Sequence, residues 1–346
     1  MLKDIRELTL EEIEELVESW TEPKYRATQI YEWLWQKSAH TFDDMTNLSK
    51  GLRDKLKEHY VIHGIEPLQT QVSNDRTIKN AFKLHDANIV EAVLIPTKSR
   101  MTVCVSSQVG CSLTCSFCAT GKLKRIRNLT AGEIYDQVAM VNKQAIEEYE
   151  IPLSNIVYMG MGEPLLNYQN VLKSIEHITS PEGLNMSPSR ITLSTAGVTK
   201  LIKKLGDDEV KFNLAVSLHA ANDEKRSELM PINDANSLAE LKEAIVYFYS
   251  KTGTRLTYEY IMFHQLNDTM QDAKELAEFC KITPCKINLI EYNPVEGDPF
   301  KCSSSDRIGA FKNFLEQKNL IVNVRRSRGK DIDAACGQLA NKNIAN

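Results

Sequence analysis

The sequence predicts an α/β fold, a full or partial β/α barrel that follows a small helical domain. From about residue 78 onward, short strand-like runs alternate with stretches of helical periodicity, as in parallel βαβ units. Roughly six units fit, which suits a barrel or part of one. The alternative is an open doubly wound sheet, but no GxGxxG or GxxxxGKS phosphate loop is present to favour its nucleotide-binding form.

The first 65 residues predict an all-helical accessory domain. Thr9 and Glu12 have capping-box spacing and place a helix start there. Pro23 separates this helix from a second one over residues 25–37, and no strand pattern is visible. We therefore set the first domain at residues 1–65.

Residues 66–100 predict a linker and a β-hairpin that turns around Asp86-Ala87-Asn88. The remainder, residues 101–346, forms the β/α core, with helix starts at the capping boxes of Thr130 and Ser237. The expected core strands lie near residues 102–107, 155–161, 190–197, 212–220, 256–263, 285–294 and 320–327. In parallel α/β folds, ligands bind at the carboxyl ends of the strands.

Composition excludes several classes of protein. The 346 residues include 42 Lys+Arg and 46 Asp+Glu, a net charge of −4, and 42% are hydrophobic, as in ordinary folded proteins. That hydrophobic share argues against disorder, and no apolar run is long enough for a transmembrane helix. The acidic start MLKDIRELTLEE does not resemble a signal peptide, so we expect a cytoplasmic protein with no membrane partner.

Cysteine spacing predicts a metal centre. Cys111, Cys115 and Cys118 form C-x3-C-x2-C between a strand and the helix capped by Thr130. A structural zinc site usually needs four ligands in two separated pairs, and no second pair is present. Three thiolates this close favour a [4Fe–4S] cluster with one iron left open for a substrate or cofactor. Zinc and chance clustering remain the alternatives.

This cysteine motif resembles the signature of the radical S-adenosylmethionine (radical SAM) superfamily. Further runs resemble the RlmN/Cfr family of radical SAM RNA methyltransferases in order from about residue 90 to 340. These runs are CVSSQVGC, GMGEPLLN, LSTAGV, VSLHA, MPIN, NLIEYNP and DIDAACGQL. The resemblance implies a partial (β/α) barrel of the radical SAM type.

The resemblance also implies an activity. An adenine C2 or C8 carbon is not nucleophilic, so ordinary methyl transfer fails. In the family, one S-adenosylmethionine methylates a cysteine, and a second, bound at the open iron, yields a 5′-deoxyadenosyl radical. That radical activates the S-methylcysteine, whose carbon is added to the base. Two molecules of S-adenosylmethionine and one [4Fe–4S] cluster are therefore expected per turnover.

Residue roles carry over by matching motifs. Cys336 matches the S-methylcysteine, Cys104 the cysteine that resolves the intermediate through a transient disulfide with Cys336, and Glu91 the proton acceptor. Matches to cofactor-binding positions are Gly162, Glu163, Ser194, Ser217, Leu218, His219 and Asn293, and the cluster ligands are Cys111, Cys115 and Cys118. Taken without the resemblance, Cys336 reads as a small buried residue and Glu91 as an outward strand carboxylate.

Two basic stripes predict RNA contact beside the site. They are Lys122, Lys124, Arg125 and Arg127, and Arg325, Arg326, Arg328 and Lys330. The helical domain, with Lys24, Arg26 and Lys37, offers a further contact. Solvated basic faces are the ordinary alternative. Cys280, Cys285 and Cys302 match nothing catalytic and are expected to be core or surface thiols.

The implied partners are 23S rRNA, tRNA and an electron donor such as flavodoxin or ferredoxin. Pro164 in GMGEPL resembles the RlmN branch, which makes 2-methyladenosine in 23S rRNA and, in some bacteria, in tRNA beside the anticodon. The CATG after the cluster resembles the Cfr branch at least as much, which makes 8-methyladenosine and confers antibiotic resistance. Rivals of other classes are a non-catalytic RNA-binding protein with a structural metal and a radical enzyme acting on a small molecule.

Overall fold

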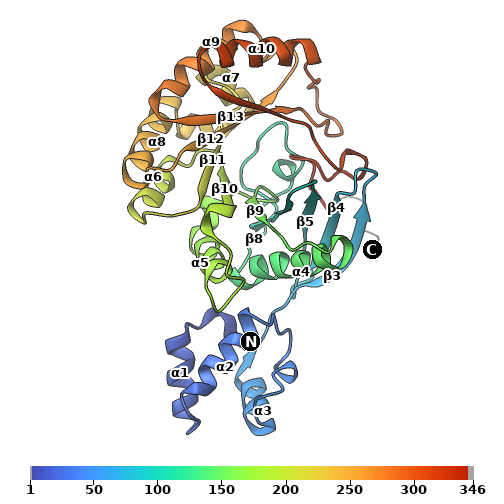
Figure 1. Ribbon diagram of the computed structural model, residues 1–346, viewed down its shortest axis with the longest axis vertical. Coiled ribbons are helices and arrows are strands. Elements are labelled where there is room, and N and C mark those ends of the chain that lie inside the picture. Colours follow the sequence, from blue (N-terminus) through green and yellow to red (C-terminus); the bar gives the residue numbers. More distant parts are fainter. Residues whose placement is uncertain (1, 342–346) are drawn as a thin grey trace.

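The computed structural model describes residues 2–341 and contains a helical appendage below a large curved α/β core (Figure 1). The α-helices are α1 (Leu10–Ser19), α2 (Tyr25–Trp35), α3 (Lys50–His59), α4 (Ala131–Tyr149), α5 (Tyr168–Thr179), α6 (Thr199–Asp207), α7 (Asp223–Leu229), α8 (Leu238–Thr252), α9 (Met270–Phe279) and α10 (Ser305–Gln317). No helix in residues 2–341 is both long and apolar enough to cross a membrane.

The core is one curved sheet. Its strand order is β14-β13-β12-β11-β10-β9-β6-β5-β4-β3. The strands are β3 (Glu66–Val72), β4 (Ile78–Lys83), β5 (Ile89–Pro96), β6 (Met101–Cys104), β9 (Asn155–Tyr158), β10 (Ile191–Thr195), β11 (Asn213–Ser217), β12 (Leu256–Met262), β13 (Cys285–Glu291) and β14 (Ile321–Arg325). Short pairs lie outside it: β1 (Lys3–Asp4) with β2 (Tyr60–Val61), and β7 (Gln108–Val109) with β8 (Arg127–Asn128).

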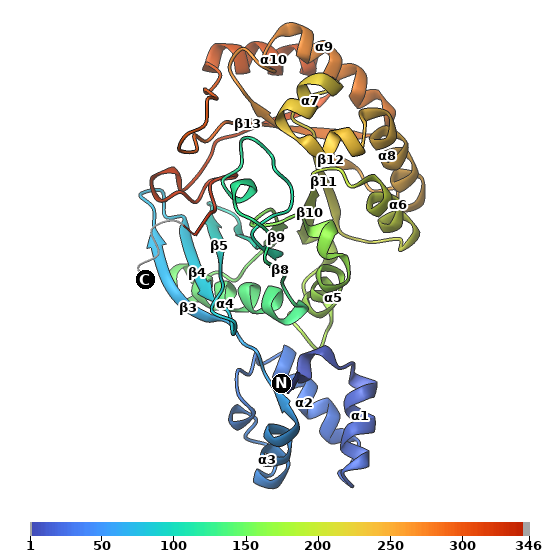
Figure 2. The ribbon, with the colours of Figure 1, turned by 180° about the vertical axis from the view of Figure 1, so that it is seen from behind.

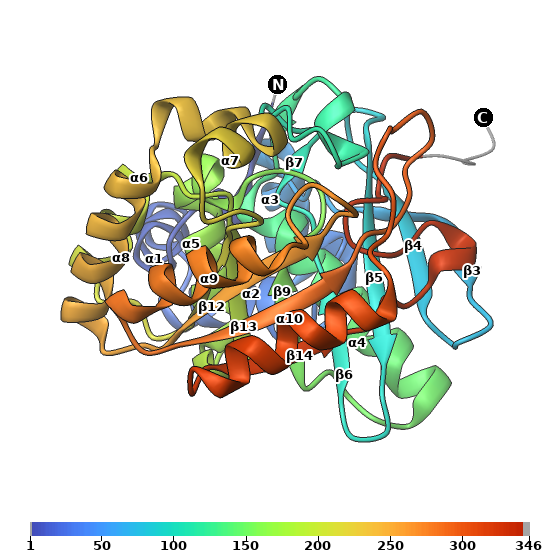
Figure 3. The ribbon, with the colours of Figure 1, turned by 90° about the horizontal axis from the view of Figure 1, so that it is seen from above.

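The sheet confirms the partial β/α barrel. Strands β6 and β9 to β14 run parallel and are connected by helical crossovers, while β3, β4 and β5 extend the sheet in antiparallel pairing. From above, helices line the outer side of the curve (Figure 3). The parallel strands therefore bring their carboxyl ends to one edge, where the loops meet.

The predicted helix starts are present. Thr9, Thr130 and Ser237 each form a full capping box, in which the N-cap side chain and the third helical residue bond each other's backbone N–H. Buried apolar faces then fix each helix against the sheet or its neighbours.

Sequence reasoning did not predict several of the strands, among them β1, β2 and β3. The accessory domain is not wholly helical, because β1 pairs with β2 in parallel, Lys3 with Tyr60 and Asp4 with Val61. Strand β3 pairs with β4 as the outer edge of the sheet. Its side chains are mostly exposed, including Leu68 and Val72, so the chain carries no in-out hydrophobic alternation there.

The appendage lies below α4 and α5 of the core (Figure 2), and buried side-chain contacts hold it there. The Trp35 ring stacks on His177 of α5, with centroids 3.5 Å apart, and burial lowers the pKa of His177 to about 3. The buried Arg6 guanidinium lies 2.9 Å from an Asp136 oxygen on α4 and also bonds Asp4. The appendage is thus docked through apolar stacking and a satisfied ion pair.

Candidate active site

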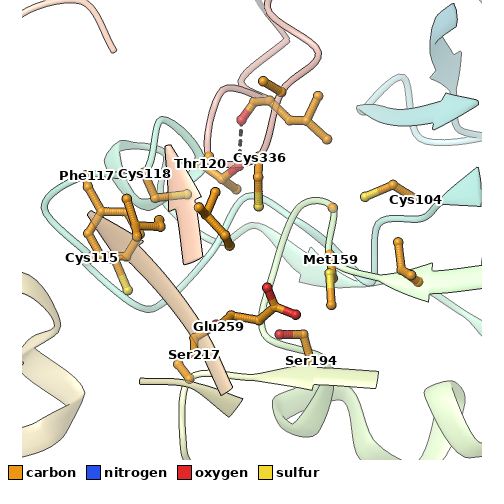
Figure 4. A pocket seen from close by; sticks show the side chains of 18 of the residues that line it. Cys104, Cys115, Phe117, Cys118, Thr120, Met159, Ser194, Ser217, Glu259 and Cys336 are labelled. Atoms are coloured by element: carbon orange, nitrogen blue, oxygen red, sulfur yellow. Dashed lines mark hydrogen bonds between the residues drawn. The ribbon is translucent and has the colours of Figure 1, made fainter. Parts of the chain in front are cut away.

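One cavity of about 230 Å³ gathers most of the residues that the sequence singled out (Figure 4). It opens where the parallel strands end, so each strand delivers a side chain at or just after its last residue. The predicted cluster, cofactor-binding and catalytic residues that line it are Cys104, Cys111, Cys115, Cys118, Gly162, Glu163, Ser194, Ser217, His219 and Cys336, and the basic residues Arg325, Arg326 and Arg328 line it as well.

The three clustered cysteines lie on a loop between β7 and β8 that is tied to two distant segments. Ser116 N–H donates to the Leu229 carbonyl (3.0 Å), and Ala119 N–H donates to the Gly337 carbonyl (2.7 Å). Burial raises the pKa of Cys111 to about 11 and raises those of Cys115 and Cys118 as well. A bound metal centre would supply the positive charge that these thiolates need.

The donor set fits an iron–sulfur cluster. Residues 2–341 hold no group of three or more His, Cys, Asp or Glu side chains arranged to bind a single ion. A cubane cluster does not require that arrangement, because each thiolate binds a different iron. With three thiols on the loop as its ligands, such a cluster would keep one iron free for another ligand.

Glu163 is a buried carboxylate at the rim of β9. Its Oε1 accepts the Leu165 N–H (3.0 Å) and its Oε2 accepts the Ala196 N–H (2.7 Å). Burial raises its pKa to about 7 even though these bonds favour the charged form. Gly162 has φ +98°, and a Cβ there would lie 2.5 Å from the Gln108 Cβ. Glycine is therefore required here by the left-handed backbone and by the close packing against Gln108. An ammonium group would suit the neighbouring carboxylate.

His219 serves the site as a neutral, fixed ring. Its Nδ1 accepts the Ile261 N–H (3.1 Å), and burial lowers its pKa to about 3. The ring contacts Phe117 of the cysteine loop edge-on, with centroids 4.9 Å apart. Ser194 and Ser217, at the ends of β10 and β11, add hydroxyl groups to the same wall.

Two expected cofactor-binding residues lie behind the wall rather than on it. Leu218 is fully buried, and Asn293 is 3% exposed. The Asn293 Nδ2 donates to the Cys336 carbonyl (3.1 Å), while its buried Oδ1 has no partner among the described residues. That free acceptor is consistent with a missing ligand donor.

Cys104 and Cys336 reach the cavity from opposite parts of the core. Cys104 ends β6, and Cys336 sits in the C-terminal loop, between Cys118 and Cys104 in the view of Figure 4. Burial raises the pKa of Cys104 to about 12 and that of Cys336 to about 11, and the positive charge of Arg325 opposes both shifts. Arg325 is itself held 3.3 Å from Glu259.

Glu259 is the cavity residue that sequence reasoning missed. It is 4% exposed, lines the cavity and accepts a bond from the Asn288 side chain (2.8 Å). Every residue of its strand, β12, is buried. The sequence could have indicated this residue, because a carboxylate within an otherwise apolar strand is buried and needs a partner.

Glu91 does not line the cavity. It is 1% exposed, so the pattern-based reading of an outward carboxylate was wrong. Its Oε2 accepts the N–H groups of Ala340 (2.9 Å) and Asn341 (3.1 Å), and its Oε1 lies 3.4 Å from Lys79 Nζ. The C-terminal segment therefore covers the side of β5 on which the Glu91 carboxylate lies.

Most of the basic stripe residues are neutralised by acids. Lys122 pairs with Asp298, Arg127 with Asp86 and Glu133, Arg325 with Glu259, Arg328 with Asp75, and Lys330 with Glu291. In the appendage, Lys24 pairs with Glu14, and Lys37 lies over the Trp33 ring. Within residues 2–341, the stripe members without an acid partner are Lys124, Arg125 and Arg326.

The remaining cysteines lie away from the cavity. Cys280 and Cys285 are buried, and Cys302 is exposed. None of the three lines the cavity. They are therefore core and surface thiols, as expected.

Comparison with known proteins covers the whole chain. The model of the ribosomal RNA large subunit methyltransferase N-terminal domain matches residues 3–62, and that of the radical SAM superfamily matches residues 105–280. The probable dual-specificity RNA methyltransferase RlmN of Christiangramia forsetii is 58% identical over 98% of this chain and 97% of its own. That of Flavobacterium psychrophilum is 55% identical over 99% of each chain.

The chain belongs to the RlmN family of radical SAM RNA methyltransferases. A crystal structure of a radical SAM methyltransferase from Sphaerobacter thermophilus, 41% identical, superposes with a TM-score of 0.92 over 97% of this chain and 99% of that one. Radical SAM membership implies S-adenosylmethionine and a [4Fe–4S] cluster. The RlmN names of these relatives favour that branch over Cfr, and the family favours an enzyme over a non-catalytic RNA-binding protein.

Proposed function

We propose that this protein methylates C2 of a specific adenine in 23S rRNA, and of an adenine beside the anticodon in tRNA, through an S-methylcysteine at Cys336. One observation carries the proposal. Cys336 and Cys104, which are outside the cluster motif, line the same cavity as Cys111, Cys115 and Cys118. A methyl carrier and a second thiol are what a two-stage methylation of an unreactive carbon requires.

The cofactor sites follow from the same cavity. Cys111, Cys115 and Cys118 would hold the [4Fe–4S] cluster, which supplies the electron that cleaves S-adenosylmethionine. Gly162 and Glu163 would receive the ammonium of that molecule, with the Glu163 carboxylate charged. Five residues are assigned to its ribose and adenine: Ser194, Ser217, Leu218, His219 and Asn293. Leu218 can contribute only through its backbone or packing, because its side chain is buried behind the wall.

The reaction of Cys336 begins with its thiolate. That thiolate attacks the methyl of one S-adenosylmethionine, and a second molecule is consumed to activate the resulting thioether. Cys336 is exposed and lines the cavity, and the guanidinium of Arg325 favours its thiolate over the thiol. The activated carbon then joins the base, so that protein and RNA are transiently linked through the Cys336 sulfur.

Release falls to Cys104. Its thiolate attacks the Cys336 sulfur, an S–S bond forms, and the carbon–sulfur bond to the base breaks with its electron pair on carbon, which takes up a proton. An external reductant then returns the disulfide to two thiols. The electron for the cluster would come from a donor such as flavodoxin or ferredoxin.

Proton removal from the adenine carbon is assigned to Glu91. In the described structure its Oε2 accepts two backbone N–H groups of the C-terminal segment. The carboxylate can reach a substrate only after Ala340 and Asn341 leave it. This role therefore requires movement of the segment that carries Cys336.

We assign RNA contact to the basic side chains of the two stripes that form no ion pair with an acidic residue among the described residues. Lys124 and Arg125 are exposed on the loop after the cluster, and exposed Arg326 lines the cavity. Guanidinium and ammonium groups of this kind bind phosphates. The target base must leave its stack to enter the cavity.

We propose residues 1–65 as an RNA-contacting accessory domain, residues 66–100 as the β extension and residues 101–346 as the catalytic core of a cytoplasmic enzyme.

Nucleoside mass spectrometry tests the proposal. The reconstituted enzyme is supplied anaerobically with S-adenosylmethionine, a reductant, and unmodified 23S rRNA or tRNA, and the RNA is digested. We expect 2-methyladenosine from both RNAs. Formation of 8-methyladenosine would reject the carbon assignment, and formation of neither, with S-adenosylmethionine still cleaved, would reject the RNA substrate.

A further inference from the structure

The C-terminal segment, residues 326–341, crosses the cavity with little regular structure of its own. Its one helical turn spans Lys330–Ile332. Such a segment holds a fixed course only if contacts at several points offset the entropy of ordering it. Cys336 lies near its middle, so the position of this thiol depends on what restrains the segment on either side.

The upstream restraint is a reciprocal pair of carboxylates. Asp331, on the segment, accepts the Ser73 hydroxyl (2.5 Å) and the Asn74 N–H (3.0 Å) of the β3–β4 turn. Asp75, on that turn, accepts the Gly329 N–H (3.1 Å), and its carbonyl accepts the Arg328 guanidinium (3.0 Å). The segment and the turn thus each supply a carboxylate that accepts a backbone N–H of the other.

The downstream restraint is Glu91 on β5. Its Oε2 accepts the Ala340 and Asn341 N–H groups, and the Asn341 Nδ2 donates to the Ile89 carbonyl (2.9 Å). Lys79 of β4, which is 3% exposed, lies 3.4 Å from the other oxygen and balances the buried charge. This contact fixes the segment only four residues beyond Cys336.

We propose that Asp75, Asp331 and Glu91 form a clamp by which the antiparallel extension β3–β5 holds the C-terminal segment, and that the clamp positions the Cys336 thiol in the cavity. All three carboxylates accept backbone N–H groups, and the points at which they hold the segment, residues 328–331 and 340–341, lie on both sides of Cys336. Their role rests on the function proposed for Cys336, and it makes them positioning residues. It also explains why this sheet continues past the parallel strands: β5 carries Glu91, and the turn between β3 and β4 carries Asp75.

The clamp gives Glu91 a part that differs from proton transfer. If Glu91 only anchors the segment, its loss should resemble loss of Asp331. If Glu91 only accepts the adenine proton, its loss should stop the reaction after the protein–RNA bond has formed, and a covalent adduct should accumulate. The two roles therefore predict different products from the Glu91→Gln variant.

Hydrogen exchange of the protein without RNA is the first arm of the test. Asp331→Ala should raise the exchange rate of the Ala340 amide and its neighbours in residues 329–341 about tenfold or more, because the charged acceptors are lost from one end. Asp331→Asn keeps one acceptor oxygen and should show a smaller rise. Glu240→Ala is the matched control: Glu240 also accepts a backbone N–H, from Ser237 (2.9 Å), but lies on α8 away from the cavity.

Coupling of cofactor cleavage to methylation is the second arm, measured on the reconstituted enzyme. A misplaced Cys336 should raise the ratio of S-adenosylmethionine cleaved to RNA methylated by about tenfold in Asp331→Ala, with the iron content unchanged. Glu91→Gln keeps one acceptor oxygen, so it should raise the ratio less, and it should accumulate no covalent adduct.

The two arms separate this proposal from the proposed function. Unchanged exchange in both Asp331 variants would overturn the clamp whatever the enzyme methylates. Faster exchange with an unchanged coupling ratio, or adduct accumulation in Glu91→Gln with normal exchange, would overturn the positioning role. If the parent enzyme methylates no RNA, the proposed function is wrong, but the hydrogen-exchange measurement still tests the clamp.

Discussion

Two sets of cysteines meet in one cavity, and they are built in opposite ways. Cys111, Cys115 and Cys118 share a single loop, so their spacing alone predicts a shared ligand. Cys104 and Cys336 come from a strand end and a distant loop, and only the folded sheet brings them to the same wall. The first set is a local motif that any fold could present, whereas the second exists only because the segment after β14 is drawn back across the cavity.

The difference also appears in how each set is held. The cluster loop is fixed by backbone bonds to α7 and to the C-terminal loop, and by the Phe117 contact with His219. Cys336 depends on carboxylates that belong to the antiparallel extension. The two sets share the bond between Ala119 and Gly337, but the carboxylates of the extension bond only the Cys336 segment. Variants of these carboxylates should therefore affect carbon transfer more than radical formation.

The largest effect should come from the local set. Cys115→Ala removes one of three thiolates, so the cluster should be lost together with both cofactor cleavage and methylation, to below detection. Iron and sulfide content of the anaerobically reconstituted protein, with cleavage assayed in parallel, checks this. A variant that keeps its full iron content and cleaves S-adenosylmethionine normally would break the assignment of this ligand.

The distant set should divide the reaction instead of abolishing it. Cys336→Ala should keep iron content and cofactor cleavage but form no methylated RNA, because the methyl carrier is missing. Cys104→Ala should form the protein–RNA bond and fail to release it. Denaturing gels with labelled RNA measure the adduct. Equal behaviour of the two variants would contradict separate roles for the two thiols.

The local and the distant cysteines also differ in how far the sequence predicts them. The capping boxes, the parallel strands and the cluster loop depend on nearby residues and were predicted. The roles of Cys104 and Cys336 could be predicted only from the family resemblance, because the residues around each form no motif that indicates a function by itself. The burial of Glu91 and the Asp75–Asp331 contacts could not be foreseen, because each depends on segments more than 200 residues apart meeting at one edge of the sheet.

A variant of Glu163 tests the binding of S-adenosylmethionine beside the cluster cysteines, with a smaller expected effect. Glu163→Gln should weaken S-adenosylmethionine binding about 10- to 100-fold, the range expected for losing a hydrogen bond to a charged group. Equilibrium binding to the reconstituted enzyme measures it. Ser250→Ala, on the far side of α8 and hydrogen-bonded only to the Tyr247 carbonyl, is the control. Unchanged affinity in Glu163→Gln would remove this residue from the cofactor site.

The same carboxyl predicts a pH dependence of stability without ligand. Burial raises its pKa from 4.5 to about 7, so the folded state holds the proton more tightly than the unfolded state. The stabilisation is complete below pH 4.5 and is lost as pH rises through 7, by about 3 kcal/mol. Denaturant unfolding at pH 5 and pH 8 should show this fall in the parent protein. The slope should shrink in Glu163→Gln, and an identical slope in both would refute the raised pKa.

The smallest effect should come from the RNA side of the cavity. Arg326→Ala should weaken RNA binding a few-fold and lower the slope of log affinity against log salt by about 0.7 to 0.9, as for one lost phosphate contact. Binding titrations at several salt concentrations measure both. Lys312→Ala, on α10 and paired with Glu316, should change neither. A loss of affinity in Arg326→Ala with no change in salt slope would argue against a phosphate contact.

The most direct test of the account follows the methyl carbon. Enzyme is first treated with isotopically labelled S-adenosylmethionine, freed of excess, and then mixed with unlabelled S-adenosylmethionine, reductant and unmodified 23S rRNA for a single turnover. Transfer through Cys336 predicts 2-methyladenosine that carries the label, and none from Cys336→Ala. Unlabelled product from the parent enzyme would mean that the carbon does not pass through this thiol.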